Sequence, residues 1–543
     1  MQFNFSKFAT VLIASGIISL PIAAHANDSS ELEELRNLVQ ELSQQVKVLA
    51  RKSEINEEAT TAATKAAPIV KASSSGFSLG SADGKNEIKF RGLLQADHRA
   101  YSAGESDVRA RSRNRAGLLN ADGFNDAEDT SLLRRVRPTI EGKVAGKYGF
   151  RFTPEFAGGS ASAVDAYVEA NLNPAFKVRA GKQKSIVGLE RLQGGGDIKF
   201  VERSYVTNAI LPNRDLGVTV SGDVLGNKLN YGVGIVNGVT DGGNISTGTE
   251  YSGEREYTAR LFATPFIDSD SALAGLGFGV GATYTDFTGE QNLNWSDSTA
   301  ADATRNGLPS YVTEGQQTFF RYGANAIADG KRFRITPQAN YYNGPLGLMA
   351  EYARVDQDVS LTAKNEGDTT TIAPAVLNSN LTPLATIAGS KKKLSHNAWQ
   401  VSGSWLLTGE DASFKGVKPK NDFDLDKGGW GAWELVARYS RIDLDNDTFK
   451  NKAGSNANEN GGTIGDAYAD PTRSAKSAQT WTAGVNWYLN ANAKIVLNYE
   501  QTSFDGGASS GIKSGNGDAF SKSNSIADRP DEKAILARFQ VAF

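Results

Sequence analysis

Arginine and lysine residues alternate with other residues in several short segments of the chain, in an arrangement that could bind anions. Position parity within these segments places the following cations on one face: Lys89, Arg91, Arg99, Arg135, Arg137, Lys143, Arg151, Lys177 and Arg179. A guanidinium offers a planar fork of donors that fits phosphate, and an ammonium is a compact point charge. Carboxylates share this face, at Asp97, Glu141, Glu155, Asp165 and Glu169. The pattern therefore predicts either an anion site or cations that pair with these acids.

The composition excludes most catalytic and metal chemistry. The 543 residues include no Cys and only 3 His, which are His25, His98 and His396. The chain therefore has no Cys nucleophile, thiolate metal site or disulfide, and a Ser-His-Asp triad has few candidates. We find no P-loop and no dinucleotide fingerprint. With 58 Lys and Arg against 61 Asp and Glu, nucleic-acid binding is not expected either. We expect no enzyme activity, no cofactor and no metal.

The elements that carry these cations alternate with period 2, which is the signature of half-buried strands. In one such segment Tyr148, Phe150 and Phe152 interleave with Gly149 and Arg151. Sixteen segments of this kind are found. They begin near Glu87, Ser131, Tyr148, Ser162, Ala175, Arg214, Asn227, Glu254, Ala274, Lys331, Leu346, Leu394, Gly429, Ser477, Ala491 and Glu532.

The connections between the segments alternate between short turns and long polar loops. Ala145-Gly146-Lys147 is a tight turn, whereas 102–130, 184–213 and 289–330 are long. This asymmetry is typical of outer-membrane barrels, in which closed antiparallel strands satisfy every backbone group in lipid. Phe543 ends an alternating apolar segment, as in bacterial outer-membrane proteins. The sequence thus predicts an all-β fold, a 16-stranded antiparallel transmembrane β-barrel embedded in outer-membrane lipid and lipopolysaccharide.

The N-terminal residues have a different organisation. An apolar run from Phe8 to Ala24 precedes a small-residue cleavage site, so 1–26 is predicted to be a signal peptide. Apolar residues then recur in steps of three and four, at Leu32, Leu35, Val39, Leu42, Val46 and Leu49. We predict a periplasmic coiled coil over 27–56, a flexible linker over 57–76 and the barrel over 77–543. The coiled coil implies an oligomer and offers a contact with the cell wall.

A 16-stranded barrel holds an aqueous channel, and a long early loop can narrow it. The candidate here is 184–213, the third long connection. Cations that cluster in the first five strands favour anions in such a channel. Arg109, Arg111, Arg113 and Arg115 in the first long loop form either an external anion-collecting row or an ordinary solvated segment.

Several segments resemble the phosphate-selective porin family. They are the stretch from Leu132 to Gly142 (LLRRVRPTIEG), Asp165-Ala166-Tyr167, Ala180 to Lys184 (AGKQK), Glu202-Arg203-Ser204, and Gly429 to Ser440 (GWGAWELVARYS). The resemblance covers the chain from about Phe77 to Phe543. It implies a trimeric 16-stranded outer-membrane channel that takes up phosphate or polyphosphate through a constriction lined by Arg, Lys and one acidic residue.

The resemblance also implies which residues line the constriction. The matching motifs are at Arg134, Arg135, Lys182 or Lys184, Arg203 and the acidic Asp165. Arg91 and Arg137 are added to the predicted constriction residues, because the alternation along their strands places them on the lumen side. Regular alternation would turn Arg134 outward, so its place in the constriction requires a strand bulge or a position above the lipid.

Other readings of the same residues remain open. The family's outer ladder of arginines has no counterpart in the sixth to eighth segments, so the channel could pass other anions. A general or sugar-permeable porin is the main alternative, although the inward Tyr167, Tyr342 and Tyr488 are scattered. A tether that binds the cell wall through the coiled coil would be compatible with either channel.

Overall fold

The computed structural model describes residues 29–102, 129–245, 254–289, 306–323, 325–362, 389–450, 467–509, 512–513, 520–521 and 526–543. The predicted signal peptide and the row from Arg109 to Arg115 lie outside these residues. The described chain divides into two units, 1–67 and 68–543.

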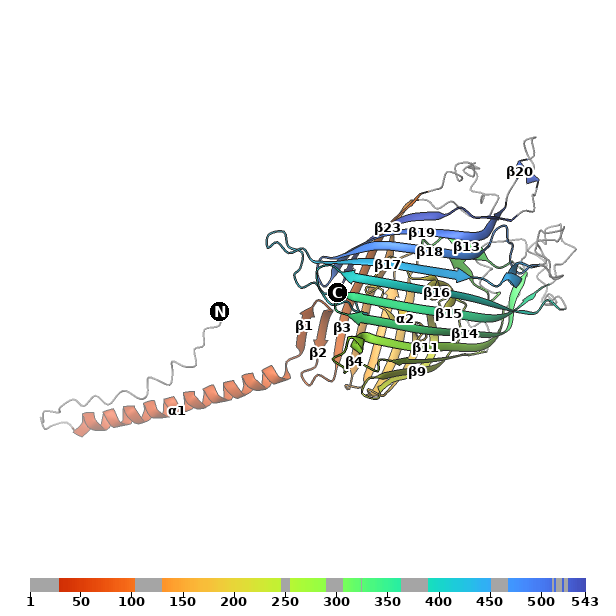
Figure 1. Cartoon of the computed structure of the whole chain (residues 1–543). Helices are drawn as coiled ribbons and strands as arrows, with labels where there is room; N and C mark the ends of the chain where they lie inside the picture. Colours follow the sequence, from red (N-terminus) through yellow and green to blue (C-terminus); the bar gives the residue numbers. More distant parts are fainter. Residues whose placement is uncertain are drawn as a thin grey trace, which may run out of the picture. The chain divides into compact units, whose positions relative to one another are not determined.

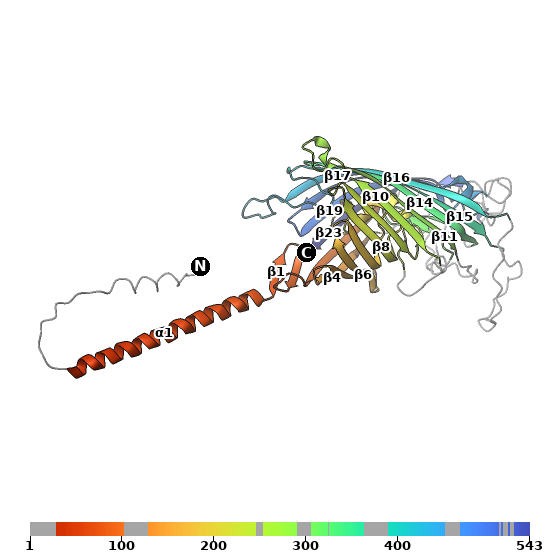
Figure 2. The same ribbon diagram turned by 90° about the horizontal axis from the view of Figure 1, so that it is seen from below.

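The second unit is a closed antiparallel β-barrel, in which strands run side by side and inclined around one ring (Figures 1 and 2). Among the described residues sixteen strands form the ring. They are β3 (Glu87–Ser102), β4 (Thr130–Val144), β5 (Tyr148–Glu155), β6 (Ser162–Asn173), β7 (Phe176–Lys184), β8 (Arg214–Val224), β9 (Leu229–Val236), β10 (Glu256–Ala263), β11 (Leu276–Thr288), β14 (Ala326–Asn343), β15 (Leu346–Leu361), β16 (Lys392–Leu406), β17 (Ala432–Asp443), β18 (Ala475–Tyr488), β19 (Ala493–Ser509) and β23 (Glu532–Ala542). Each begins within a few residues of its predicted start, so the predicted fold class is confirmed.

The ring closes where the last strand pairs with the first. β23 pairs antiparallel with β3, with Arg538 opposite Asp97. At the end of this seam, Gly92 and Phe543 exchange backbone hydrogen bonds of 2.8 and 3.0 Å. A Cβ atom at Gly92 would lie 2.5 Å from the Phe543 ring, so only glycine leaves room for that side chain.

Side chains alternate between an apolar outer face and a polar lumen, as a lipid-embedded barrel requires. On β3 and β23, Phe90, Leu94, Ile535 and Phe539 are exposed on the outer face. The neighbouring inward residues are buried and polar, and they include Gln95, Asp97, Arg99, Arg538 and Gln540. Low apolar content therefore reflects a lumen filled with polar side chains.

The buried pair at the seam holds the ring closed. Asp97 accepts hydrogen bonds from Arg538 Nε at 2.7 Å and Nη2 at 2.8 Å, and both side chains are at most 1% exposed. We expect Asp97→Ala to lower the free energy of unfolding by about 3–5 kcal/mol, because it leaves a buried guanidinium without its counter-ion. Urea unfolding in detergent measures this. Asp356→Ala, which removes the surface partner of Arg354, should cost at most about 1 kcal/mol. Equal costs would contradict the prediction.

The segment 57–76, predicted as a flexible linker, has regular structure at both ends. Helix α1 (Ser29–Ala66) continues through its first half, and β1 (Ile69–Ser73) pairs with β2 (Gly76–Gly80), which pairs in turn with β3. The helix carries the predicted apolar stripe, and Leu35, Leu42 and Leu49 are about 60% exposed. The coiled coil itself stays a prediction. Among the described residues no helix is both long and apolar enough to cross a membrane.

Short elements in the connections were not predicted. They are α2 (Leu189–Leu192), the π-helix η3 (Val206–Ile210), the 3₁₀ helices η4 (Ala272–Gly275) and η6 (Asn446–Phe449), and the strands β12 (Ser310–Val312), β13 (Thr318–Arg321), β20 (Ile512–Lys513), β21 (Phe520–Ser521) and β22 (Ile526–Asp528). Two of the connections concerned enter the lumen, and these form the candidate site.

Candidate functional site

Loop 3, defined here as residues 185–213 between β7 and β8, crosses the lumen and bonds to strands around the ring. Its segment 187–206 contacts Gln95 on β3, Gln338 on β14, Glu351 on β15, Glu434 on β17 and Asn498 on β19. The predicted narrowing of the channel by the third long connection therefore agrees with this geometry.

Lumen side chains satisfy the backbone of loop 3, which a loop inside a barrel needs. The Glu351 carboxylate accepts the N–H groups of Leu189 at 2.6 Å and Glu190 at 3.0 Å. Asn498 Oδ1 accepts the N–H of Val201 at 2.8 Å. Because β15 and β19 lie on the far side of the ring from β7 and β8, which loop 3 connects, the loop is held across the pore rather than along one side.

Arg134 reaches the lumen through a bulge in β4. The pairing of β3 with β4 shifts register between Gln95 and Ala96, so that Arg134 is left without a partner between Leu133 and Arg135. Its Nε donates to Glu202 Oε1 of loop 3 at 2.6 Å. Of the two positions that the sequence left open for Arg134, the structure has the bulge.

Most cations of the lumen pair with a carboxylate. The pairs are Arg134 and Arg99 with Glu202, Arg137 with Glu155, Arg151 with Glu141, Arg179 with Glu169, Arg214 with Asp165, Arg334 with Glu256 and Asp241, and Arg438 with Glu190 and Glu314. The ion pairing that the sequence pattern allowed thus occurs along much of the lumen, and the anion site stays a prediction.

Several cations beside loop 3 form no ion pair in the part of the chain that the structure describes. Of these, we call Arg135, Lys184, Arg191 and Arg203 the unpaired cation cluster, and we do not count Lys494, which donates to the carbonyl oxygen of Ile198. Lys184 Nζ and Arg203 Nη2 both donate to the carbonyl oxygen of Gln193, at 2.6 and 2.9 Å. Arg135 donates to Gln95 Oε1, and its Nε has no partner although it is buried. A Cβ at Gly195 would lie 3.3 Å from that Nε, so Arg135 passes directly beside loop 3.

Burial and mutual repulsion act on the loop 3 members of this cluster. Burial and the neighbouring Arg214 lower the pKa of Arg203 to about 10, against the opposing effect of Glu190. Burial, with Arg203 and Arg214, also lowers the pKa of Arg191. Guanidinium groups keep their charge in proteins, so an anion that entered the cluster would relieve this repulsion.

Glu202 is the acid that neutralises one side of the cluster. Burial acts to raise its pKa, but the Arg134 and Arg99 guanidiniums outweigh burial and hold the pKa below the usual range. Glu202 therefore stays ionised at every pH at which the pore would work. It keeps Arg134 and Arg99 paired, and leaves Arg135 without a carboxylate.

We expect Glu202→Gln to raise the ratio of anion to cation permeability about threefold, because it frees two guanidiniums while it preserves side-chain volume. The reversal potential across a planar bilayer in a salt gradient measures this ratio. Asp268→Asn, at an exposed turn, is the matched control and should leave the ratio unchanged. A fall in the ratio would contradict the assignment of Glu202 as the neutralising acid.

The other predicted site residues lie at different places. Lys182 is buried and donates to the carbonyl oxygen of Ile245 at 2.7 Å, while Asp165 holds Arg214 at 3.0 Å. Arg137 is paired with Glu155 at 2.5 Å. Arg91 is half-exposed, lies 3.6 Å from Glu141 and has no contact with the cluster. Of the predicted cations, the structure brings Arg135, Lys184 and Arg203 together, with Arg134 nearby.

A second connection that enters the lumen was not predicted. The inner hairpin, defined here as residues 308–322, contains β12 and β13 and buries Tyr311, Phe319 and Phe320 to 1% exposure or less. Its Phe319 packs edge-on against Tyr205 of loop 3, with ring centroids 5.9 Å apart. At its tip Tyr101 donates to the carbonyl oxygen of Gly315 at 2.6 Å. Four aromatic residues within 308–322, in a connection that is otherwise largely polar, were the signal available in the sequence.

Sequence analysis also missed Arg191 and Glu202 as members of the site. Both lie in loop 3, where period-2 parity does not apply, and Arg191 bonds to Asn213 at 2.7 Å next to Arg214. In the Glu202-Arg203-Ser204 motif, the family resemblance points to Arg203 alone. Its acidic neighbour was the available signal for a charge that neutralises Arg134.

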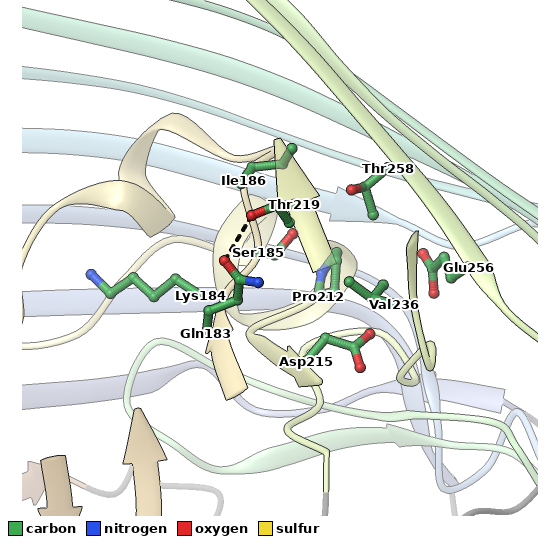
Figure 3. Close-up of a pocket in the computed structure, with 10 residues that line it drawn as sticks. All are labelled: Gln183, Lys184, Ser185, Ile186, Pro212, Asp215, Thr219, Val236, Glu256 and Thr258. Atoms are coloured by element: carbon green, nitrogen blue, oxygen red, sulfur yellow. Dashed lines mark hydrogen bonds between the residues drawn. The ribbon is translucent and has the colours of Figure 1, made fainter. Parts of the chain in front are cut away.

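The cavity that Lys184 of the unpaired cation cluster helps to line has no room for a solute. It has a volume of about 10 Å³ and lies between the start of loop 3 and strands β8 to β10 (Figure 3). Figure 3 shows Lys184 pointing away from the other lining residues, which include Ser185, Asp215 and Glu256. This space holds one water at most. The described residues contain no group of three His, Cys, Asp or Glu that could hold a metal ion.

The chain is similar in sequence to one protein family and in fold to several solved structures. The family profile described as phosphate-selective porin O and P matches residues 108–508, about three quarters of the chain. No curated protein sequence gives a significant match.

Similar solved structures include OmpT of Vibrio cholerae, which is 11% identical, with 84% of this chain and 99% of that chain covered and a TM-score of 0.44. The outer-membrane channel DcaP of Acinetobacter baumannii is 12% identical, with 84% of this chain and 97% of that chain covered and a TM-score of 0.45. An anion-selective porin from Comamonas acidovorans is 11% identical, with 84% of this chain and 100% of that chain covered and a TM-score of 0.44.

Proposed function

Because the chain belongs to the family of phosphate-selective porins O and P, and is therefore an outer-membrane porin, we propose that it gives passive, anion-preferring diffusion, with phosphate or polyphosphate as the solute. The constriction that we propose is lined by the unpaired cation cluster and Arg134, with Glu202 as the acid. We propose that Asp165, Arg137 and Lys182 lie along the approach to it, where they contact Arg214, Glu155 and the carbonyl oxygen of Ile245. Arg91 serves as a cation of the approach to it.

The observation that supports this proposal most is the carbonyl oxygen of Gln193, which accepts from both Lys184 and Arg203. A neutral carbonyl is a weaker partner for two cations than an anion is. A passing phosphate oxygen can replace it, because guanidinium and ammonium donors already point at one location. When the anion leaves, the Gln193 carbonyl oxygen again accepts the hydrogen bonds of Lys184 and Arg203. The pore therefore binds the anion weakly enough for it to pass.

The test is made on the purified protein in a planar bilayer. We expect a reversal potential of the anion-selective sign in a chloride gradient, and a block of the chloride current by millimolar phosphate. A cation-selective sign would overturn the anion preference. An anion-selective sign without phosphate block would overturn phosphate as the solute, and leave a channel for other anions.

A general or sugar-permeable porin remains the second candidate, and the extent of ion pairing in the lumen favours it. Arg137, Arg151 and Arg179 are all paired and attract anions less than free cations do. Liposome swelling with uncharged sugars distinguishes the candidates, since a strictly anion-preferring pore would swell vesicles slowly.

We further propose that the mature chain forms a homotrimer in contact with lipid and lipopolysaccharide, and that α1 forms a periplasmic coiled coil after removal of 1–26. The exposed Leu35, Leu42 and Leu49 on one stripe of α1 support an association of this helix with copies of itself. Deletion of 27–75 should leave the conductance intact. If the coiled coil contacts the cell wall, the same deletion should alter attachment of the envelope.

A further inference from the structure

Three inward residues form a row across the wall opposite β7 to β9. Arg438 of β17 is the register partner of Thr482 of β18, which is the register partner of Glu500 of β19. Side chains directly opposite each other in such a ladder have Cβ atoms about 5 Å apart. Glu500 therefore stands beside Thr482, and Arg438 stands on the far side of that threonine.

The tip of the inner hairpin brings a second carboxylate to this row. Glu314 Oε2 accepts from Thr482 Oγ1 at 3.2 Å and from Arg438 Nε at 3.2 Å. Glu314 thus lies over Thr482, next to Glu500. Arg438 is already shared, since its Nη1 lies 3.4 Å from Glu190 Oε1. One guanidinium consequently faces three carboxylates.

Among the described residues, Glu500 has no partner for its charge. It is 2% exposed, and both of its carboxylate oxygens lack a hydrogen bond. Glu314 is 1% exposed, and its Oε1 also lacks a partner. Glu532 lies in the next row of the wall, and its two carboxylate oxygens accept from Thr313 Oγ1 at 2.9 and 3.1 Å. It supplies no hydrogen-bond donor to Glu500 or Glu314. A buried carboxylate without a donor or a counter-ion is costly, so these three oxygens call for a donor that the described chain does not supply.

A primary ammonium group has the complementary chemistry. It is a compact cation with three N–H donors, and three unpartnered carboxylate oxygens lie together here. The row is also adjacent to the unpaired cation cluster, because Glu190 contacts Arg438 with its side chain and Arg203 Nε with its carbonyl oxygen, at 3.4 Å each. A short solute with an anionic group and an ammonium group could therefore contact both.

We propose that Glu500 and Glu314 form a subsite for the ammonium group of a zwitterionic organic anion, which the pore holds with its anionic group at the unpaired cation cluster. This inference rests on the proposed function, since it assumes that solute passes along loop 3. It adds a second charge to the solute and assigns a role to the inner hairpin, which carries Glu314 to the wall.

The experiment compares two blockers that differ by one ammonium group. In planar bilayers, 2-aminoethyl phosphate should block the chloride current of the unaltered protein at concentrations about tenfold lower than ethyl phosphate does. Glu500→Gln should remove this difference and leave the block by ethyl phosphate in place. Glu314→Gln should have the same effect. Glu87→Gln, at the turn end of β3 and without an ion pair among the described residues, should preserve the tenfold difference.

The outcomes separate the inference from the proposed function. If neither phosphate blocks, the part of the proposed function that names phosphate as the solute fails. If ethyl phosphate blocks and 2-aminoethyl phosphate blocks no better, the ammonium subsite is wrong while the anion site stands. A difference that survives in both Glu500→Gln and Glu314→Gln, each shown to be folded by its heat-dependent mobility in gels, also overturns the subsite. If Glu87→Gln also lost the tenfold preference for 2-aminoethyl phosphate, the effect would not be specific to Glu500 and Glu314, and the subsite would be overturned.

Discussion

Replacement of Arg135, Lys184 and Arg203 together by glutamine is expected to lower the anion to cation permeability ratio at least about tenfold, and to abolish block by phosphate. Two unit charges 4 Å apart interact by about 4 kcal/mol at an effective dielectric constant of 20. A tenfold change requires about 1.4 kcal/mol, so the loss of three unpaired cations exceeds this threshold after screening by salt. The variant removes three positive charges while Glu202, Glu190 and Glu314 remain with their arginine partners, so the constriction would become much less basic.

The reversal potential in a salt gradient gives the ratio, and the chloride current with added phosphate gives the block. The matched control removes cations together with their partners, in Arg151→Gln with Glu141→Gln and Arg179→Gln with Glu169→Gln. This control changes four lumen charges but not their sum, and its ratio should change less than about twofold. If the control loses as much selectivity as the triple variant, the unpaired cluster has no special place in the pore.

Replacement of the inner hairpin, 308–322, by a short Gly-Ser linker is expected to raise the single-channel conductance about threefold. The hairpin fills the lumen beyond loop 3 with Tyr311, Phe319 and Phe320, which are almost fully buried. Their removal would open a wider aqueous path on that side and leave the contacts of loop 3 with Glu351 and Asn498 in place. Single-channel recording in concentrated salt measures the change.

The control for this variant replaces the exposed connection 156–161 between β5 and β6 by Gly-Ser residues of equal number. Its conductance should equal that of the unaltered protein. An unchanged conductance after removal of the hairpin would mean that loop 3 alone sets the resistance. In that case anion preference would also be unchanged, because the unpaired cation cluster does not include the hairpin.

The alternation of side chains was sufficient to predict the barrel strands, but it could not predict the lumen. Strand starts such as Glu87, Tyr148 and Leu346 follow from period-2 patterns with punctuating turns. The bulge at Arg134 does not, since it arises from the pairing of two strands and leaves alternation within one strand unaltered. A single sequence therefore predicts which residues face inward in a regular strand, and misses the residue that an irregularity turns inward.

The candidate site was predictable only in part for a similar reason. Parity identified Arg135 and Arg137 equally, yet the structure pairs Arg137 with Glu155 and leaves Arg135 unpaired. That distinction depends on register across neighbouring strands and on the path of loop 3. The same applies to Glu500, whose isolation results from contacts between residues far apart in the sequence.

The seam between β3 and β23 has a kinetic consequence. It joins residues as distant as Ala100 and Ile535, so the final closing contact spans most of the chain. Non-local pairings of this kind form slowly, because the chain loses the entropy of a long loop before the stabilising contacts form. Until they form, β3 and β23 both present unpaired backbone groups, which are templates for pairing with other chains. The chain consequently needs protection during assembly until the two edges meet, and Gly92 must by then leave room for Phe543.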